Sequence, residues 1–125
     1  MRAKILVVED EADIAEVVRL VLETVDFEVR TVLDSTRACD EAAAWHPDLI
    51  LVDLLMPKMD GWAVFKRLRS DPSLARVPIA ILTAKSQEFD AMVGLHVMKA
   101  DAYITKPFGK QELLDTVNGL LSARS

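Results

Sequence analysis

The chain has 125 residues, 51% of them hydrophobic and 28% charged, a balance typical of one folded domain rather than a disordered segment. Its net charge of −5 argues against direct binding of nucleic acid or of an anionic membrane surface. The single cysteine, Cys39, excludes an internal disulfide, and no Cys/His cluster suggests a zinc site. No apolar run is long enough to form a secretory signal or to span a bilayer, so we expect a cytoplasmic protein.

Short apolar segments alternate along the chain with segments of helical periodicity. The first is Ile5 to Val8, a continuous apolar run typical of a buried parallel strand. Apolar side chains then recur at helical spacing: Ile14, Val17, Val18, Val21, Leu22 and Val25. Residues 27–32 alternate loosely and predict the second strand. The alanine-rich residues 36–45 predict a helix that ends before Pro47, because the residue before a proline avoids the α conformation.

The second half of the chain continues this alternation. Leu49 to Val52 is the most apolar strand, and a turn containing Gly61 leads from it to a helix that carries Phe65 and Leu68 inward. The remaining expected elements are a strand over residues 78–82, a less regular helix over residues 86–97 and a short strand over residues 102–105. A last helix places apolar residues on one face: Leu113, Leu114, Val117, Leu120 and Leu121.

Strands that alternate with helices imply right-handed crossovers and a parallel sheet covered on both faces. We therefore predict one domain over residues 1–125, a five-stranded, doubly wound α/β sandwich. Ligands of such folds bind beyond the carboxyl ends of the strands. The polar residues at those ends are Glu9, Asp10, Asp53, Thr83 and Lys106. The sequence thus places three carboxylates, a hydroxyl and an ammonium at one edge of the sheet.

These side chains suit phosphoryl transfer assisted by a metal ion. Three neighbouring carboxylates repel one another unless a cation neutralises them. Mg²⁺ prefers oxygen ligands and often binds through one or two carboxylates together with a phosphate. Aspartate can act as a nucleophile that forms an aspartyl phosphate. The transfer needs cancellation of charge on the phosphoryl oxygens, which a metal ion, the Lys106 ammonium and the Thr83 hydroxyl supply together.

Short motifs, in order along essentially the whole chain, resemble those of the bacterial response-regulator receiver domain. They are Glu9-Asp10, Asp53-Leu54-Leu55-Met56-Pro57, Asp60-Gly61, Thr83-Ala84 and Lys106-Pro107-Phe108. The resemblance implies a flavodoxin-like fold with the strand order 2-1-3-4-5. It also implies a phospho-acceptor switch of a two-component phosphorelay. Such a switch is not an enzyme beyond self-catalysed acceptance and loss of the phosphoryl group.

The resemblance further implies how the acceptor and the metal are held. Asp53 would accept the phosphoryl group from a phosphohistidine. Asp10 and Asp53 would contact Mg²⁺ directly, with Mn²⁺ as the alternative ion. Glu9 would act on the metal largely through water, and the backbone carbonyl of Leu55 would be a further ligand.

It also implies a switch and partners. Lys106 would pair with the phosphoryl oxygens, and a cis peptide bond is usual between it and Pro107. Thr83 would hydrogen-bond one phosphoryl oxygen on activation, and Tyr103 would be the switch aromatic that swings inward when the threonine moves. The implied donor is a sensor histidine kinase or a histidine phosphotransfer protein. The implied output is a protein target or a second copy of the chain, bound through the face of the fourth helix, fifth strand and fifth helix.

Two other functions remain open at this point. An aspartate-nucleophile phosphatase of the haloacid-dehalogenase type would share the aspartate at the strand end. It needs a second acid two residues later, where this chain has Leu55, and this argues strongly against it. A phosphorylation-independent adaptor would keep the fold without the switch, which the intact acids, Thr83 and Lys106 disfavour.

Overall fold

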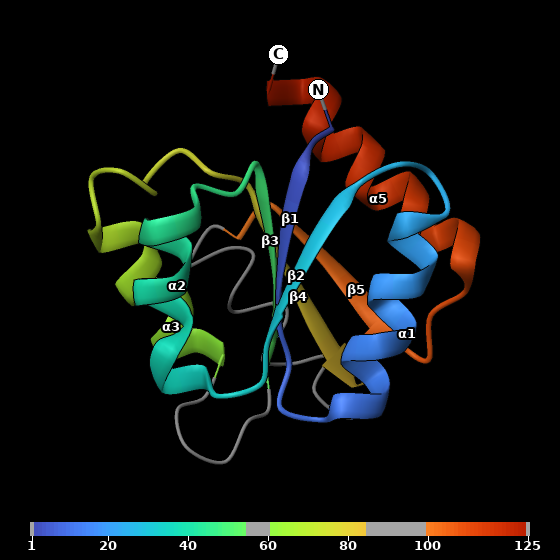
Figure 1. The fold of residues 1–125 in the computed structure, drawn as a ribbon, viewed down its shortest axis with the longest axis horizontal. Coiled ribbons are helices and arrows are strands. Elements are labelled where there is room, and N and C mark those ends of the chain that lie inside the picture. Colours follow the sequence, from blue (N-terminus) through green and yellow to red (C-terminus); the bar gives the residue numbers. More distant parts are fainter. Residues whose placement is uncertain (1, 55–60, 85–99, 125) are drawn as a thin grey trace.

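The structure, a computed structural model, describes residues 2–54, 61–84 and 100–124, with the backbone alone for residues 83, 84 and 124. In these residues the chain forms a five-stranded parallel sheet in the order β2-β1-β3-β4-β5 (Figure 1). The strands are β1 (Lys4–Val8), β2 (Glu28–Val32), β3 (Leu49–Asp53), β4 (Ile79–Ala84) and β5 (Ala102–Lys106). The predicted fold class and strand order are therefore confirmed.

Helices cover both faces of the sheet. Helices α1 (Ala12–Glu23) and α5 (Lys110–Arg124) lie on one face, and α2 (Ala38–Trp45) and α3 (Gly61–Ser70) lie on the other (Figure 1). A short 3₁₀ helix, Ser35–Arg37, precedes α2. The helix predicted over residues 86–97 lies outside the described residues. In the parts of the chain that are described, no helix is both long enough and apolar enough to cross a membrane.

Side chains of the central strands alternate between two hydrophobic cores. One core, beneath α2 and α3, takes Leu6, Val8, Ile50 and Val52 from β1 and β3. The other core, beneath α1 and α5, takes Ile5, Val7, Leu49 and Leu51 from the same strands. These side chains are fully buried, and each contributes roughly 1.5–3 kcal/mol to folding. Because both faces of β1 and β3 are covered, each strand is apolar at consecutive positions rather than at alternate ones.

Helix α1 buries only part of its predicted apolar face. Val18 and Leu22, on the inner face of the helix, are fully buried. Val17 is 54% exposed, and Val25 lies beyond the last residue of the helix and is 42% exposed. The apolar pattern is therefore wider than the strip of helix that meets the sheet, and Val17 and Val25 lie outside that strip.

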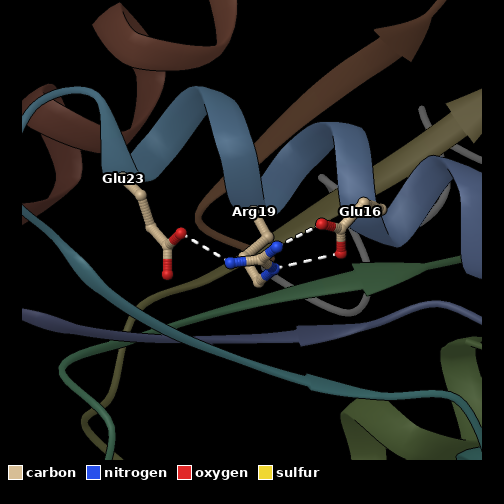
Figure 2. Close-up of polar contacts among 3 residues, drawn as sticks. All are labelled: Glu16, Arg19 and Glu23. Atoms are coloured by element: carbon tan, nitrogen blue, oxygen red, sulfur yellow. Dashed lines mark hydrogen bonds and ion pairs between the residues drawn. The ribbon is translucent and has the colours of Figure 1, made fainter.

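A partly exposed side of α1 carries an ion-pair cluster centred on Arg19 (Figure 2). Its Nη1 lies 2.6 Å from Oε1 of Glu23, and its Nε lies 3.1 Å from Oε2 of Glu16. The third nitrogen of the Arg19 guanidinium, Nη2, also contacts Glu16. These partners stand three and four residues away along the helix, the spacings at which side chains of opposite charge meet and stabilise a helix. The cluster therefore supports α1 locally and leaves its inner face free to pack.

The predicted end of α2 before Pro47 is confirmed. The helix ends at Trp45, and His46 takes a left-handed backbone conformation with φ 57°. The residue before a proline avoids the α region, so the helix cannot continue through His46. The Trp45 ring is then covered by the Arg30 guanidinium, with 4.8 Å between Cζ and the ring centroid.

A polar clamp ties the end of α3 to the starts of β4 and β5. Asp101 accepts hydrogen bonds from the backbone N–H of Ile79 at 2.8 Å and from Nη2 of Arg69 at 2.5 Å. Nη1 of Arg69 also donates to the carbonyl of Val77 at 2.6 Å. Hydrogen bonds to charged groups of this kind each contribute about 1.5–3 kcal/mol. The clamp therefore holds α3 against the edge of the sheet formed by β4 and β5.

Candidate functional site

Three carboxylates meet at the carboxyl edge of the sheet, as predicted. Glu9 and Asp10 follow β1 directly, and Asp53 is the last residue of β3. One carboxylate oxygen from each lies within 4.8 Å of the other two. β1 and β3 are hydrogen-bonded neighbours whose register pairs Val8 with Val52. The residues that follow this pair therefore emerge side by side.

Glu9 is the most enclosed of the three acids, with a side chain that is 0% exposed. Its Oε1 accepts a hydrogen bond from the N–H of Glu11 at 3.2 Å, and its Oε2 accepts one from Nζ of Lys106 at 3.1 Å. Burial, hydrogen bonding to Asp53 and the charge of Asp53 raise the pKa of Glu9 to about 7, against a smaller opposing effect of Lys106. Full ionisation of the cluster near neutral pH therefore calls for a further cation.

Lys106 joins the cluster from β5. Its Nζ lies 3.1 Å from Oε2 of Glu9 and 3.1 Å from Oδ1 of Asp53. Partial burial disfavours the ammonium form, but the charges of Asp53 and Glu9 outweigh burial and raise the pKa of Lys106. The peptide bond to Pro107 is cis, as the resemblance implied. A permanent positive charge therefore bridges the two enclosed carboxylates.

Asp10 supplies an oxygen that suits a metal ion. Its Oδ1 is buried and has no hydrogen-bond partner among the described residues. A buried acceptor without a donor is unfavourable by about 1–3 kcal/mol, and more when it is charged, unless a cation satisfies it. The three carboxylates form an all-oxygen donor set of the kind that Mg²⁺ prefers. The site residues therefore fit the predicted ion, while Leu55, the predicted carbonyl ligand, lies outside the described residues.

Gly61 holds the strand end that carries Asp53. Its N–H donates to the carbonyl of Leu54 at 2.8 Å, which brings the start of α3 against the end of β3. A Cβ on Gly61 would lie 2.4 Å from the carbonyl oxygen of Asp53 and 2.6 Å from Cα of Leu54. Such distances leave no room for any side chain, so the close approach requires glycine. In the sequence, Gly61 stood in a turn and in the Asp60-Gly61 motif, and neither feature indicates this contact.

Thr83 and Tyr103 come from the neighbouring strands. The register pairs Asp53 with Leu82, so the backbone of Thr83 lies one residue beyond the partner of Asp53, opposite Thr105. The side chain of Thr83 lies outside the described residues. Tyr103 is partly buried in the core beneath α2 and α3, and burial raises its pKa to about 12.

The Tyr103 ring packs against Trp62, which is not among the predicted site residues. Ring centroids of Tyr103 and Trp62 are 6.3 Å apart, with 72° between the ring planes, an edge-to-face contact. The Tyr103 hydroxyl is shielded from solvent and lacks a hydrogen-bond partner in the described parts of the chain. The sequence feature that could have identified Trp62 is its position directly after Gly61, in the first turn of the helix that follows the Asp53 strand.

We expect the metal-free protein to lose stability between pH 5 and 8 because of Glu9. The folded chain keeps a proton on Glu9 up to a pKa of about 7, whereas the ordinary value is 4.5. In that window unfolding releases a proton, so the free energy of unfolding falls as pH rises, by at most about 3 kcal/mol for one group. Chemical denaturation at several pH values, compared with Glu9→Gln, isolates this contribution. The prediction would be contradicted if the free energy of unfolding of the wild type fell with pH no more steeply than that of Glu9→Gln.

The sequence of residues 5–118 matches the response regulator receiver domain family. The chain is 41% identical over 121 residues to the alkaline phosphatase synthesis transcriptional regulatory protein PhoP of Bacillus subtilis, covering 97% of this chain and 49% of that protein. It is also 41% identical over 121 residues to the DNA-binding response regulator MtrA of Mycobacterium tuberculosis, covering 97% of this chain and 51% of MtrA. The chain thus spans about half the length of the curated relatives it matches.

Solved structures show the same architecture. The signal receiver domain of a signal transduction histidine kinase from Syntrophus aciditrophicus superposes with a TM-score of 0.87 at 36% identity, covering 97% of this chain and 91% of that one. The chemotaxis protein CheY4 of Vibrio cholerae superposes with a TM-score of 0.89 at 29% identity, covering 96% and 99%. The curated relatives named above extend well beyond the matched region. The expectation that the chain does not bind nucleic acid therefore applies to these 125 residues alone.

Proposed function

The chain belongs to the response regulator receiver family, and from that premise we propose that Asp53 accepts a phosphoryl group from a phosphohistidine of a partner protein. The observation that carries the proposal is the position of Lys106. Its ammonium lies 3.1 Å from Oδ1 of Asp53. In the same cluster, Asp10 has a buried carboxylate oxygen that lacks a donor among the described residues. This arrangement offers a carboxylate nucleophile with positive charge beside it.

In the proposed reaction a carboxylate oxygen of Asp53 attacks phosphorus. The phosphorus–nitrogen bond of the donor breaks as the new phosphorus–oxygen bond forms, and the imidazole leaves with the electron pair. Lys106 is held by Glu9 as well as by Asp53, so its ammonium stays in place to pair with the phosphoryl oxygens. When bound, Mg²⁺ or Mn²⁺ supplies further cancellation of the charge on those oxygens. Asp10, Asp53 and the Leu55 carbonyl would hold it directly, and Glu9 through water.

The proposed readout is a change of the protein-binding surface near β5. Phosphorylation adds about −1.5 to −2 charges and three strong acceptor oxygens. Thr83 follows the strand partner of Asp53, which supports its role as the hydroxyl that responds to the phosphoryl group. Tyr103, with a hydroxyl that lacks a partner among the described residues, would reorient in turn. The output would be a cytoplasmic protein target or a second copy of the chain, bound through the fourth helix, β5 and α5.

A groove beside the site suits the phosphohistidine partner. It is lined by Asp13, Ile14, Val17, Lys106, Pro107 and Phe108. A donor must approach Asp53 from this edge, and the groove shares Lys106 with the acceptor site. Val17 is exposed to solvent because it lines this groove and does not pack in either core.

Replacing Val17 with serine should slow phosphoryl transfer from a histidine kinase that phosphorylates the wild type, by about threefold or more. Uptake from acetyl phosphate should not change, because this small donor needs no docking surface. Leu20→Ser is the matched control, since Leu20 is 53% exposed on the same helix but does not line the groove. Equal slowing with both donors would remove the groove from the proposal.

The experiment that tests the proposed function is intact mass after incubation with Mg²⁺ and acetyl phosphate. The wild type should gain one phosphoryl group, and Asp53→Asn should gain none, because the amide lacks the nucleophilic oxygen charge. Omitting Mg²⁺ should suppress the gain in the wild type.

The other functions predict different results in the same experiment. An adaptor would gain no mass even with a phosphorylated histidine donor, and it would not bind beryllofluoride, which imitates a phosphoryl group. A phosphatase would release phosphate continuously from small phosphoesters. The phosphatase is disfavoured because Leu55 occupies the position where such an enzyme needs an acid.

A further inference from the structure

The first residues of α3 connect the acceptor strand to Tyr103. Gly61 donates its N–H to the Leu54 carbonyl at 2.8 Å, with no space for a Cβ against the Asp53 backbone. The next residue, Trp62, makes the edge-to-face contact with Tyr103 of β5, with ring centroids 6.3 Å apart. One helix end therefore contacts both the backbone of the acceptor and the predicted switch aromatic.

Trp62 is held from behind by its own helix. Its ring makes a second edge-to-face contact with Phe65, at 6.0 Å between centroids and 85° between planes, and Phe65 is only 2% exposed. The Arg69 guanidinium lies 5.2 Å from the Phe65 ring centroid and binds Asp101 at the start of β5. Trp62, Phe65 and Arg69 thus form a row on α3 that contacts Tyr103 of β5 at one end and Asp101, just before β5, at the other. A shift of the indole would therefore disturb its contact with the buried Phe65 ring.

The orientation of Tyr103 is a balance between two opposing effects. Its hydroxyl is shielded and has no hydrogen-bond partner within the described residues, which favours orientations that return the hydroxyl to water. The ring, in contrast, gains from its contact with Trp62 and from packing in the core beneath α2 and α3. A change in the Trp62 contact alone would therefore shift the population of Tyr103 orientations.

We propose that Trp62 is a positioning residue that holds the partly buried Tyr103 ring with its hydroxyl shielded, and so sets the fraction of molecules in which that hydroxyl is exposed. The functional consequence rests on the proposed function, in which Tyr103 is the switch aromatic. A displacement of the Asp53 backbone reaches Tyr103 through Gly61 and Trp62, a path separate from the one through Thr83. Such coupling requires contacts that run without a gap from Asp53 to Tyr103. It also requires an element that can adopt two arrangements, which here is Tyr103.

Tyr103 is the only tyrosine of the chain, so incorporation of 3-fluorotyrosine yields one ¹⁹F signal that reports this ring. Relaxation of that signal by a soluble gadolinium chelate measures the exposure of the ring. The comparison uses wild type, Trp62→Leu and Trp62→Phe, without any phosphoryl donor. Trp45→Leu is the matched control, because Trp45 is the other tryptophan and its described ring contacts are with Lys4 and Arg30.

Trp62→Leu should increase the gadolinium-induced relaxation of Tyr103 by about threefold or more, since it removes the edge-to-face contact. Trp62→Phe should restore most of the wild-type value, and Trp45→Leu should leave it unchanged. Phe65→Leu loosens the support behind Trp62 and should increase relaxation in the same direction, which decides the case if Trp62→Leu does not fold. Unchanged relaxation in the Trp62 and Phe65 variants, or an equal rise in Trp45→Leu, would overturn the inference.

Intact mass with acetyl phosphate on the same variants separates this inference from the proposed function. If the wild type takes up a phosphoryl group but the Trp62 variants do not differ from it in Tyr103 exposure, the role of Trp62 is overturned and the proposed function stands. A difference in exposure without uptake by the wild type would leave the role of Trp62 standing and overturn the proposed function. A purely structural role of Trp62 would lower stability without changing the exposure of Tyr103 under native conditions.

Discussion

Lys106→Met should slow phosphoryl uptake at Asp53 from acetyl phosphate by about 100-fold. Methionine keeps most of the length and volume of the side chain but removes the ammonium, whose Nζ lies 3.1 Å from Oδ1 of Asp53. Negative charge on the transferred oxygens then loses a fixed positive partner in a largely enclosed site. The rate is measured by intact mass at saturating Mg²⁺.

The same substitution should tighten Mg²⁺ binding, by about threefold to tenfold at pH 8.5, because it removes a positive charge from the carboxylates that would hold the cation. Damage to the fold would weaken both properties together, so opposite changes identify an effect of charge. Lys110→Met is the control, since Lys110 is exposed at the start of α5 and should affect neither property. Loss of both uptake and Mg²⁺ binding in Lys106→Met would contradict the assigned role of the ammonium.

Gly61→Ala should lower the free energy of unfolding by about 2–4 kcal/mol. The added methyl group would lie 2.4 Å from the Asp53 carbonyl oxygen and 2.6 Å from Cα of Leu54, well inside van der Waals contact. Both atoms belong to the backbone at the end of the central strand β3, where a shift disturbs the pairing with β1 and β4. Urea denaturation monitored by circular dichroism measures the loss.

Gly119→Ala provides the matched comparison. Gly119 lies within α5, and a Cβ there would meet nothing within 4 Å. This variant should gain about 0.5–1 kcal/mol, because alanine is the better helix former. Equal effects of the two substitutions would show that Gly61 is an ordinary helix-start residue. Gly61→Ala should also reduce phosphoryl uptake, because moving the strand end moves Asp53.

The sequence by itself determined the fold class and most of the candidate site. The apolar runs that became β1 and β3 identify strands buried on both faces, and their alternation with helices implies a parallel sheet. Glu9, Asp10, Asp53 and Lys106 were predictable because each stands at the carboxyl end of a strand. Parallel strands bring those ends to one edge, so the topology alone places these residues together.

Only the tertiary structure decided the contacts between side chains of different elements. Periodicity along the chain could not show that Val17 faces a groove, that Gly61 touches the Asp53 backbone or that Trp62 meets Tyr103. The raised pKa of Glu9 likewise depends on burial and on the nearby charge of Asp53. Spacing in the sequence specifies which face of an element is apolar, whereas these properties depend on how closely helices settle on the sheet. That distance is set by the packing of the whole core.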